Sequence, residues 1–560
     1  MSPKKSSSEQ ASAATRSGLE RHFILVAGIL LATLVVTQIG SALQESPTND
    51  EPVHLTIGYV YLTTGQYLME QQQHPPLGRV LAALPLLTLP SRHVPPDQTW
   101  FTLGTVLWDN PPSAILLHAR LVIIALTFLF GAWLSWWTRR QFGAAVALLA
   151  LTFFCFDPNI IAHGHYVTTD LIASFGIFLA CTLWTDFLQG PTFKALVLAV
   201  GALGLAFISK YSALFLLIVL PLLYGFAWRR KSGQLCFTMR GSIGVVLFTT
   251  LGALSCITLA YAPATLAGAH SPTVTDSRTL QLVSEVKSVV LMSSVLYIEG
   301  LNQLRQHESQ GNPAYLLGKF GHSGWWQYFP IAFLVKTPTG ILLACLFAAV
   351  SLLYIKRQPA PVLPILCLTL APTIYFVSAI LSSIDIGVRH ILPVYPFLYV
   401  FLAFVLVRYG PSLLGRACPF LIAGLIVLTG LESLLSYPHY LAFFNWPSGG
   451  PAKGADYLLD SNLDWGQDTD NLKKYVQDTR STPLCTALFG HPPPHYFGTG
   501  TPDFFTTSTP QGIGNLNCVA AVSVNFVKGL FVGPEAFALL RQREPSAKIG
   551  FSIYLYDLRH

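Results

Sequence analysis

Charged residues are scarce in this sequence. Asp, Glu, Lys and Arg make up only 11% of its 560 residues, while 52% are hydrophobic and the mean hydropathy is +0.51. A soluble domain carries about 25% charged residues. The scarcity of charge excludes an ordinary soluble domain and predicts a polytopic membrane protein, for which lipid is the main solvent.

Two further features are missing. The net charge is +7, yet no basic stripe interleaved with aromatic residues is present, so no nucleic-acid partner is expected. The nine cysteines form no CxxC pair, and five lie in apolar runs, where cysteine behaves as a small buried hydrophobe. Cys485 and Cys518 lie in the polar C-terminal part and are compatible with a disulfide, but the sequence leaves their pairing open.

Eleven apolar runs are present, and two of them (143–160 and 195–209) are short. The runs lie near residues 22–42, 113–137, 143–160, 168–188, 195–209, 211–228, 242–263, 337–355, 361–383, 388–407 and 418–436. Basic residues gather in alternate connections: Arg139, Arg140, Lys194, Arg229, Arg230, Lys231, Lys356, Arg357, Arg408 and Arg416. If every run spans, these connections share one side with the N-terminal arm, and the positive-inside rule makes that side cytoplasmic.

This pattern predicts the fold class, an all-α polytopic membrane protein of about 11 transmembrane helices followed by a C-terminal extracytoplasmic α/β domain. We expect a disordered cytoplasmic arm at 1–21, a membrane domain at 22–438 with outer loops at 43–112 and 264–336, and the C-terminal domain at 439–560. Residues 54–73 predict an interfacial helix, 77–90 a re-entrant or interfacial segment, and 518–526 and 551–556 strands.

Acidic residues mark two outer helix ends. Asp50 and Glu51 follow the first apolar run, and Asp170 opens another. Placing an ionisable group at a membrane boundary costs free energy unless the group is solvated or paired, and such groups often have a functional role. A solvated loop with a helix cap is the alternative for the pair, and a favourable helix N-terminal charge is the alternative for Asp170.

Three cations, Lys210, Lys336 and Arg389, also adjoin apolar runs on the outer side, against the positive-inside bias. Snorkelling side chains are the simplest explanation of such a lysine. The presence of three cations at outer helix ends instead favours a binding site for an anion, such as a lipid phosphate.

Other polar and aromatic residues are candidates for substrate binding. Trp325 and Trp326 suit either an interfacial belt or a platform for a sugar ring. In the segment 460–468, Asp464 and Trp465 suit a hydroxyl-rich ligand or a capped helix start, and calcium is disfavoured because no Glu follows at the twelfth loop position. His163 and His165 alone are a weak metal signal.

Several motifs, taken in order, resemble the GT-C membrane glycosyltransferases over residues 20–440. The similarity is to family 39, the protein O-mannosyltransferase-like and aminoarabinose-transferase-like group. The motifs are Asp50-Glu51, His74-Pro75-Pro76-Leu77-Gly78, Thr168-Thr169-Asp170, Ser209-Lys210-Tyr211-Ser212, Lys336-Thr337-Pro338 and Arg389-His390-Ile391-Leu392-Pro393. The C-terminal part is similar to that of bacterial members and departs from the eukaryotic protein mannosyltransferases, which puts a protein acceptor in doubt.

The resemblance implies an inverting transfer from a polyprenyl-phosphate sugar to a lipid, glycan or protein acceptor, outside the bacterial inner membrane. It implies Asp50 as the catalytic base, because an acceptor hydroxyl needs a carboxylate to take its proton. Glu51 is expected to orient the acceptor and Asp170 to be a second acidic group, while Arg389, Lys336 and Lys210 meet the phosphate. The expected substrate-binding residues are His74, His165, Trp325, Trp326, His390, Asp464 and Trp465. No metal is required, because the donor carries its own leaving group, but part of the family binds a divalent metal and the sequence leaves this open.

A lipid-linked sugar flippase or transporter is the main alternative function, and a membrane scaffold is a weaker one. A transporter favours charges at mid-membrane and inverted repeats, whereas these charges adjoin the outer helix ends.

The topology is testable with reporter fusions. A fusion after residue 230 is expected to give a cytoplasmic signal, because it follows the basic connection at Arg229 and Arg230. A fusion at residue 560 is expected to give an extracytoplasmic one. A cytoplasmic signal at residue 560 would contradict the arrangement.

Overall fold

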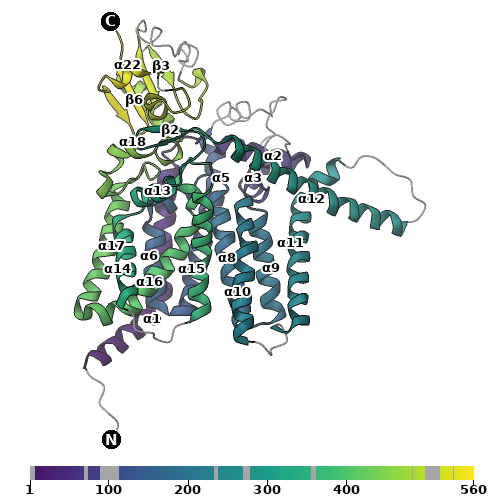
Figure 1. Cartoon of the computed structure of the whole chain (residues 1–560). Coiled ribbons are helices and arrows are strands. Elements are labelled where there is room, and N and C mark those ends of the chain that lie inside the picture. Colours follow the sequence, from purple (N-terminus) through teal and green to yellow (C-terminus); the bar gives the residue numbers. More distant parts are fainter. Residues whose placement is uncertain are drawn as a thin grey trace.

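The computed structural model describes residues 7–67, 73–88, 112–231, 237–268, 278–354, 361–481, 483–497, 517–533 and 535–559. A bundle of long helices forms most of the molecule, and a small sheet sits on one end of it (Figure 1). Helix α1 (Ser7–Ala42) enters the bundle at the end opposite the sheet (Figure 1).

Each of the eleven apolar runs folds as a helix. The helices are α1 (Ser7–Ala42), α5 (Pro112–Phe142), α6 (Ala144–Phe156), α8 (Asp170–Gln189), α9 (Phe193–Phe207), α10 (Leu216–Lys231), α11 (Met239–Gly268), α14 (Thr339–Tyr354), α15 (Val362–Ile380), α16 (Val394–Leu414) and α17 (Cys418–Leu435). Within the described residues, seven helical segments are long and apolar enough to cross a membrane, one of them containing both α16 and α17. A bent pair, α13 (Tyr328–Lys336) with α14, makes up to eight, while α6 and α9 are shorter apolar helices.

Burial separates the centre of the bundle from its rim. In α8, 78% of the most apolar window is buried, against 11% in α11. Large apolar side chains such as Leu251 and Leu259 on α11 are exposed. Apolar side chains facing outward suit a lipid environment, so the chain is an integral membrane protein with α11 at its edge.

Short elements cover the end of the bundle that carries the sheet. They are α2 (Glu51–Thr64), α3 (Leu77–Ala83), the 3₁₀ turn Leu84–Thr88, α7 (Pro158–His163) and the hairpin of β1 (Ala314–Leu316) and β2 (Lys319–Gly321). A helix is present in the segment predicted to be interfacial, but it ends at Thr64 and most of its residues are buried, which is not the exposure expected of an interfacial helix. Tyr61 and Tyr67 instead pack with Tyr211, Tyr261 and Tyr297.

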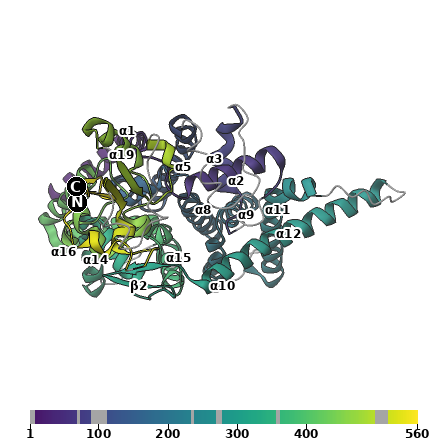
Figure 2. The same ribbon diagram turned by 90° about the horizontal axis from the view of Figure 1, so that it is seen from above.

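A further helix was not predicted from the sequence. Helix α12 (Arg278–Gln310) is 33 residues long and passes over the same end of the bundle. It runs out beyond α11 (Figure 2). Its mixed polar and apolar composition resembles neither a span nor a simple loop, which explains why the apolar pattern missed it.

The C-terminal part contains a four-stranded sheet in the order β3 (Leu484–Ala487), β4 (Val519–Ser523), β6 (Ile553–Asp557), β5 (Ala547–Ile549). Strands β3 and β4 are parallel, and the other pairs are antiparallel. Helix α19 (Thr469–Thr479) packs on the sheet through Leu472 and Val476. Cys485 and Cys518 form a disulfide beside the β3–β4 pair.

Both predicted strands are present, although the first is shorter than expected because α21 (Val524–Lys528) begins directly after it. Two more short helices, α18 (Gly454–Tyr457) and α22 (Ala538–Arg541), belong to this part of the chain. Residues 440–465 do not belong to a detached domain. Tyr440, Leu458 and Leu463 are part of the main core with the membrane helices.

A buried ion pair fixes the start of α2 against the bundle. The Arg120 guanidinium on α5 donates to both Glu51 carboxylate oxygens, at 2.9 Å and 2.6 Å, and both side chains are almost fully buried. Burial alone would raise the pKa of Glu51. The charge and hydrogen bonds of Arg120, together with the Thr48 and Val167 N–H groups, outweigh burial, so the pKa of Glu51 lies below its ordinary value. Arg120 also donates to the carbonyls of Ala42, Glu45 and Ser46. The pair therefore fastens the 42–51 connection to α5.

Replacing Arg120 with Met is expected to destabilise the protein by about 3–5 kcal/mol, because the Glu51 charge remains buried without its partner. Arg139→Met on the same helix is the matched control. Its ion pair with Glu20 is solvent-exposed, so the expected loss is at most about 1 kcal/mol. Thermal unfolding in detergent measures both, and equal losses would contradict a structural role for Arg120.

Candidate active site

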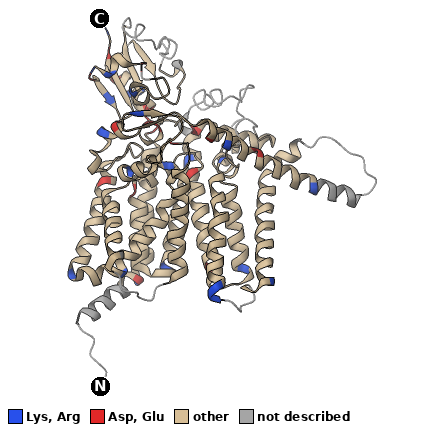
Figure 3. Ribbon diagram, in the orientation of Figure 1, with Lys and Arg blue, Asp and Glu red and all other residues tan. Residues whose placement is uncertain are grey.

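A cavity of about 700 Å³ opens at the end of the bundle below the C-terminal sheet. It is lined by residues from α2, α3, α8, α12, α13, α15, the 3₁₀ turns Tyr211–Phe215 and Val388–Ile391, and the C-terminal part. Acidic and basic residues gather at this level, whereas the charged residues at the other end of the bundle are mainly basic (Figure 3). The cavity thus combines charged groups with the outer ends of apolar helices.

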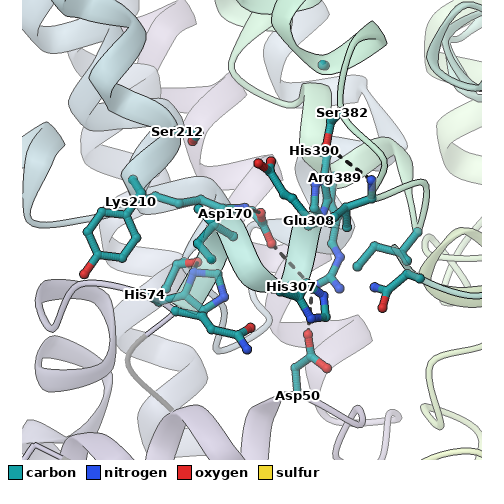
Figure 4. A pocket seen from close by; sticks show the side chains of 18 of the residues that line it. Asp50, His74, Asp170, Lys210, Ser212, His307, Glu308, Ser382, Arg389 and His390 are labelled. Atoms are coloured by element: carbon teal, nitrogen blue, oxygen red, sulfur yellow. Dashed lines mark hydrogen bonds and ion pairs between the residues drawn. The ribbon is translucent and has the colours of Figure 1, made fainter. Parts of the chain in front are cut away.

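Four charged side chains form a continuous chain on the cavity wall (Figure 4). Lys210 Nζ lies 2.5 Å from Asp170 Oδ1, and Arg389 Nη1 lies 3.7 Å from Asp170 Oδ2. The same Arg389 nitrogen donates to Asp50 Oδ2 at 2.8 Å. Two cations therefore balance two carboxylates. Asp170 lies between Lys210 and Arg389 and contacts both of them.

Local structure explains how Asp50 reaches this position. It is the residue before α2, and Pro52 stands at the start of that helix, where the missing N–H costs no hydrogen bond. The preceding loop is fixed to the C-terminal part, because the Asn49 N–H donates to the Trp465 carbonyl at 2.8 Å. Asp50 is therefore held at the junction of the first loop, α2 and the C-terminal part.

Arg389 is held from three directions. It belongs to a 3₁₀ turn (Val388–Ile391), and the Val388 N–H donates to the Asn462 side-chain oxygen at 2.9 Å. A Cβ on Gly387 would lie 2.4 Å from Ser461 Oγ, so glycine permits this close approach. The guanidinium carbon lies 4.2 Å from the centre of the Trp465 ring, a cation–π distance.

The histidines of the cavity are held neutral. Burial, followed by the nearby Arg79, lowers the pKa of His54 to about 3, and the Arg79 Nε donates to His54 Nδ1 at 3.1 Å. Burial likewise lowers the pKa of His74 and His390 well below the ordinary value. At neutral pH, the arginine and lysine side chains therefore supply the positive charge of the cavity wall.

Seven of the predicted site residues line the cavity: Asp50, Asp170, Lys210, Arg389, His74, His390 and Trp465. The segments that carry them are far apart in the sequence, and their order along the chain does not reveal the contacts between them. The structure brings them together at one end of the bundle.

Three predicted site residues have structural partners away from the cavity, which corrects their predicted roles. Glu51 faces Arg120 rather than an acceptor. Lys336 is buried, and its Nζ donates to the carbonyls of Leu441 and Asn462, so it does not line the cavity. His165 Nε2 lies 2.7 Å from Glu45 Oε2, and this residue does not line the cavity either.

The other three corrections concern the C-terminal part and the segment before α13. Asp464 is buried and accepts a hydrogen bond from the Gly466 N–H, so it does not line the cavity. Trp325 and Trp326 are not among the lining residues either, and Trp326 is 66% exposed. The sequence alone could not distinguish these positions, because each side chain type also suits its structural role.

Several lining residues were missed: Asn49, His54, Arg79, Arg305, His307, Glu308 and Asp460. Those on α12 had no signal, because the helix itself was not predicted. Asp460 lies in the segment 460–468, but nothing in the sequence distinguishes it from Asp464 as a residue that faces a ligand. Burial raises the pKa of Asp460 to about 7, and Arg389 only partly offsets this effect.

No group of three or more His, Cys, Asp or Glu side chains suited to a metal ion occurs in the part of the chain that the structure describes. His163 is buried without a third ligand beside it and His165, and the two rings pack around Tyr166. The cavity wall combines carboxylates with cations. A carboxylate can accept a proton, and a cation can bind an anion.

Among the solved structures that the chain matches is ArnT from Cupriavidus metallidurans bound to undecaprenyl phosphate, at 13% identity and a TM-score of 0.49, covering 96% of this chain and 98% of that one. The Archaeoglobus fulgidus oligosaccharyltransferase is 12% identical, with a TM-score of 0.46 and coverage of 92% and 72%. The S. cerevisiae Pmt1-Pmt2 complex bound to its sugar donor is 20% identical, with a TM-score of 0.33 and coverage of 44% and 33%.

A comparison with curated proteins finds no match. The family model described as dolichyl-phosphate-mannose-protein mannosyltransferase matches residues 93–264, which include Asp170 and Lys210. This match agrees with the predicted resemblance to protein O-mannosyltransferase-like enzymes and with the prediction that the chain is a glycosyltransferase.

Proposed function

We propose that this glycosyltransferase moves a sugar from a polyprenyl-phosphate donor to an acceptor hydroxyl, with inversion, on the extracytoplasmic face of the bacterial inner membrane. The observation that carries the proposal is the chain of ion pairs Lys210–Asp170–Arg389–Asp50 on the cavity wall. It places a carboxylate beside two cations at the end of a lipid-facing bundle. A base for the acceptor and a site for a lipid phosphate are the two groups that such a transfer needs.

Arg389 and Lys210 are suited to the donor phosphate. When the sugar leaves, negative charge grows on the phosphate oxygen, and fixed cations in a buried site stabilise it. The guanidinium can bind two phosphate oxygens at once, while the lysine contributes a point charge. The matched family model is named for a dolichyl-phosphate sugar, and the proposed donor belongs to that chemical class. In this scheme the two cations stabilise the leaving group, and no metal is needed.

Asp170 acts as a positioning residue in this scheme. Its two oxygens face different cations, Lys210 and Arg389, so it holds both in the cavity before the donor arrives. The incoming phosphate then shares these cations with the carboxylates. The balance of two cations and two carboxylates keeps this group of four side chains neutral, which lowers the cost of burying it.

Asp50 is suited to the general base. Its Oδ1 faces only the Asn49 amide at 3.4 Å among the hydrogen bonds of the described residues, so this oxygen is open to a further donor. An acceptor hydroxyl there would give its proton to the carboxylate as its oxygen attacks the anomeric carbon. Attack opposite the leaving phosphate inverts that carbon.

The orientation rests on charge. Basic residues lie at the end of the bundle away from the cavity, including Arg229, Arg230 and Lys231 at the end of α10 (Figure 3). The positive-inside rule assigns that end to the cytoplasm and the cavity to the outside. The charged cluster lies at the outer helix ends rather than at mid-membrane, which favours transfer over the transporter alternative.

Asp50→Asn is expected to lower the transfer rate by about 10²–10⁴, because the amide cannot take the acceptor proton. Donor affinity should not fall, since Arg389 loses a competing carboxylate. Purified protein in nanodiscs, with labelled undecaprenyl-phosphate mannose or glucose, separates the two readouts. Normal turnover by Asp50→Asn would contradict the assignment. Glu51→Gln should instead lower stability, because Glu51 pairs with Arg120.

Arg389→Ala is expected to weaken donor binding by about 2–5 kcal/mol if the phosphate contact is a desolvated charge pair. Arg389→Lys should recover part of the loss, because it keeps the charge but not the two-pronged contact. Arg416→Ala, at an exposed position at the other end of the bundle, is the control and should change nothing. Donor binding equal in all four proteins would refute the phosphate assignment.

A further inference from the structure

One wall of the cavity comes entirely from the C-terminal part of the chain. Asp460, Trp465, Phe489 and Phe531 line the cavity, although they lie beyond the last membrane helix. The Arg389 guanidinium stacks on the ring of Trp465. The other three side chains have no role in the proposed handling of the donor phosphate or the acceptor proton, so their purpose is open.

Asp460 has a free carboxylate oxygen in the cavity. Its Oδ1 accepts the Ser461 N–H at 2.5 Å, and within the described part of the chain no hydrogen bond reaches Oδ2. The backbone is in the left-handed region with φ of 58°, and its N–H donates to the Asn525 side-chain oxygen at 2.9 Å. The surrounding structure therefore holds a non-glycine residue in a strained conformation that presents its carboxylate to the cavity.

Phe531 shows the same kind of strain. Its φ is 69°, and its ring stacks on that of Phe489 with centroids 5.2 Å apart and planes 6° apart. Phe489 is buried, but Phe531 remains 42% exposed. Six non-glycine residues in the described part of the chain have positive φ, and two of them line this cavity. Such strain gathers at functional sites, where it fixes a side chain that binding requires.

We propose that Phe531, backed by Phe489, and Asp460 form the acceptor subsite, and that its occupant is a sugar ring. The inference rests on the proposed function and adds the chemical class of the acceptor. A pyranose offers an apolar C–H face to an aromatic ring and hydroxyl groups to a carboxylate. A cavity of about 700 Å³ lies in the range that holds a small ligand, which suits a sugar unit better than a folded protein.

The reaction balances with this occupant. A hydroxyl of the bound ring gives its proton to Asp50, and its oxygen forms the new bond to the anomeric carbon of the donor. The bond from that carbon to the phosphate oxygen breaks, and the phosphate keeps the electron pair beside Arg389. Asp50 later returns the proton to water. Asp460 takes no part in these steps and only orients the ring, so it is a specificity-determining residue.

Acceptor binding can be separated from donor chemistry with simple probes. The full chain in nanodiscs receives labelled undecaprenyl-phosphate mannose or glucose with methyl α-glucopyranoside, methyl α-mannopyranoside or an N-acetylated Ser/Thr peptide as acceptor. Slow hydrolysis of the donor without acceptor reports on the donor site alone. The variants are Phe531→Leu and Asp460→Asn.

Two matched controls are available. Phe320 on β2 is also 42% exposed but lies outside the cavity lining. Asp456 precedes Asp460 by four residues and forms an exposed ion pair with Lys528. Phe320→Leu and Asp456→Asn should therefore leave transfer unchanged. Equal thermal unfolding of all variants checks that the fold is intact.

We expect transfer to a methyl glycoside and not to the peptide. Phe531→Leu and Asp460→Asn should each raise the KM for that glycoside about tenfold, with kcat and donor hydrolysis nearly unchanged, because they remove ground-state binding of the acceptor. Transfer only to the peptide, donor hydrolysis without transfer to either glycoside, or a wild-type KM in both variants would overturn the inference. Failure of the wild-type protein to consume donor would instead overturn the proposed function.

Discussion

Charged side chains that are buried at the ends of the apolar helices must be neutralised by partners, and the rest of the structure depends on this constraint. Arg389 is the clearest case, because it is nearly buried, pairs with Asp50 and Asp170, and stacks on Trp465. A guanidinium cannot lose its charge in a protein, so it requires such partners. These contacts join the first outer loop, helix α8, the turn before α16 and the C-terminal part at one point.

Two layers of polar contacts follow from this constraint. Glu51 with Arg120, and Glu45 with His165, lie in the interior and fasten the first loop to the bundle. Asp50, the neighbour of Glu51, faces the cavity instead. Adjacent carboxylates thus have different roles, one structural and one open to ligand. The C-terminal part closes the same cavity, so it completes the site rather than forming an appended domain.

The sequence by itself determined the general architecture. Low charge, long apolar runs and alternating basic connections depend on the local cost of placing residues in lipid, and each acts without knowledge of the fold. The positions of all eleven helices followed from them. Asp50, Asp170, Lys210 and Arg389 stood out for the same reason, because a charge at a helix end is visible in the sequence.

Only the tertiary structure decided which of these charges share a cavity. Lys336 and Arg389 look alike in sequence, yet Lys336 is enclosed by backbone carbonyls while Arg389 faces the site. The same holds for Glu51 and Asp50. Helix α12 and the role of Asp460 were also hidden. Arg389 and Asp50, which form an ion pair, are 339 residues apart in the sequence, and no local sequence pattern predicts a contact over that separation. Burial and pairing depend on how the helices pack, which is a property of the whole chain.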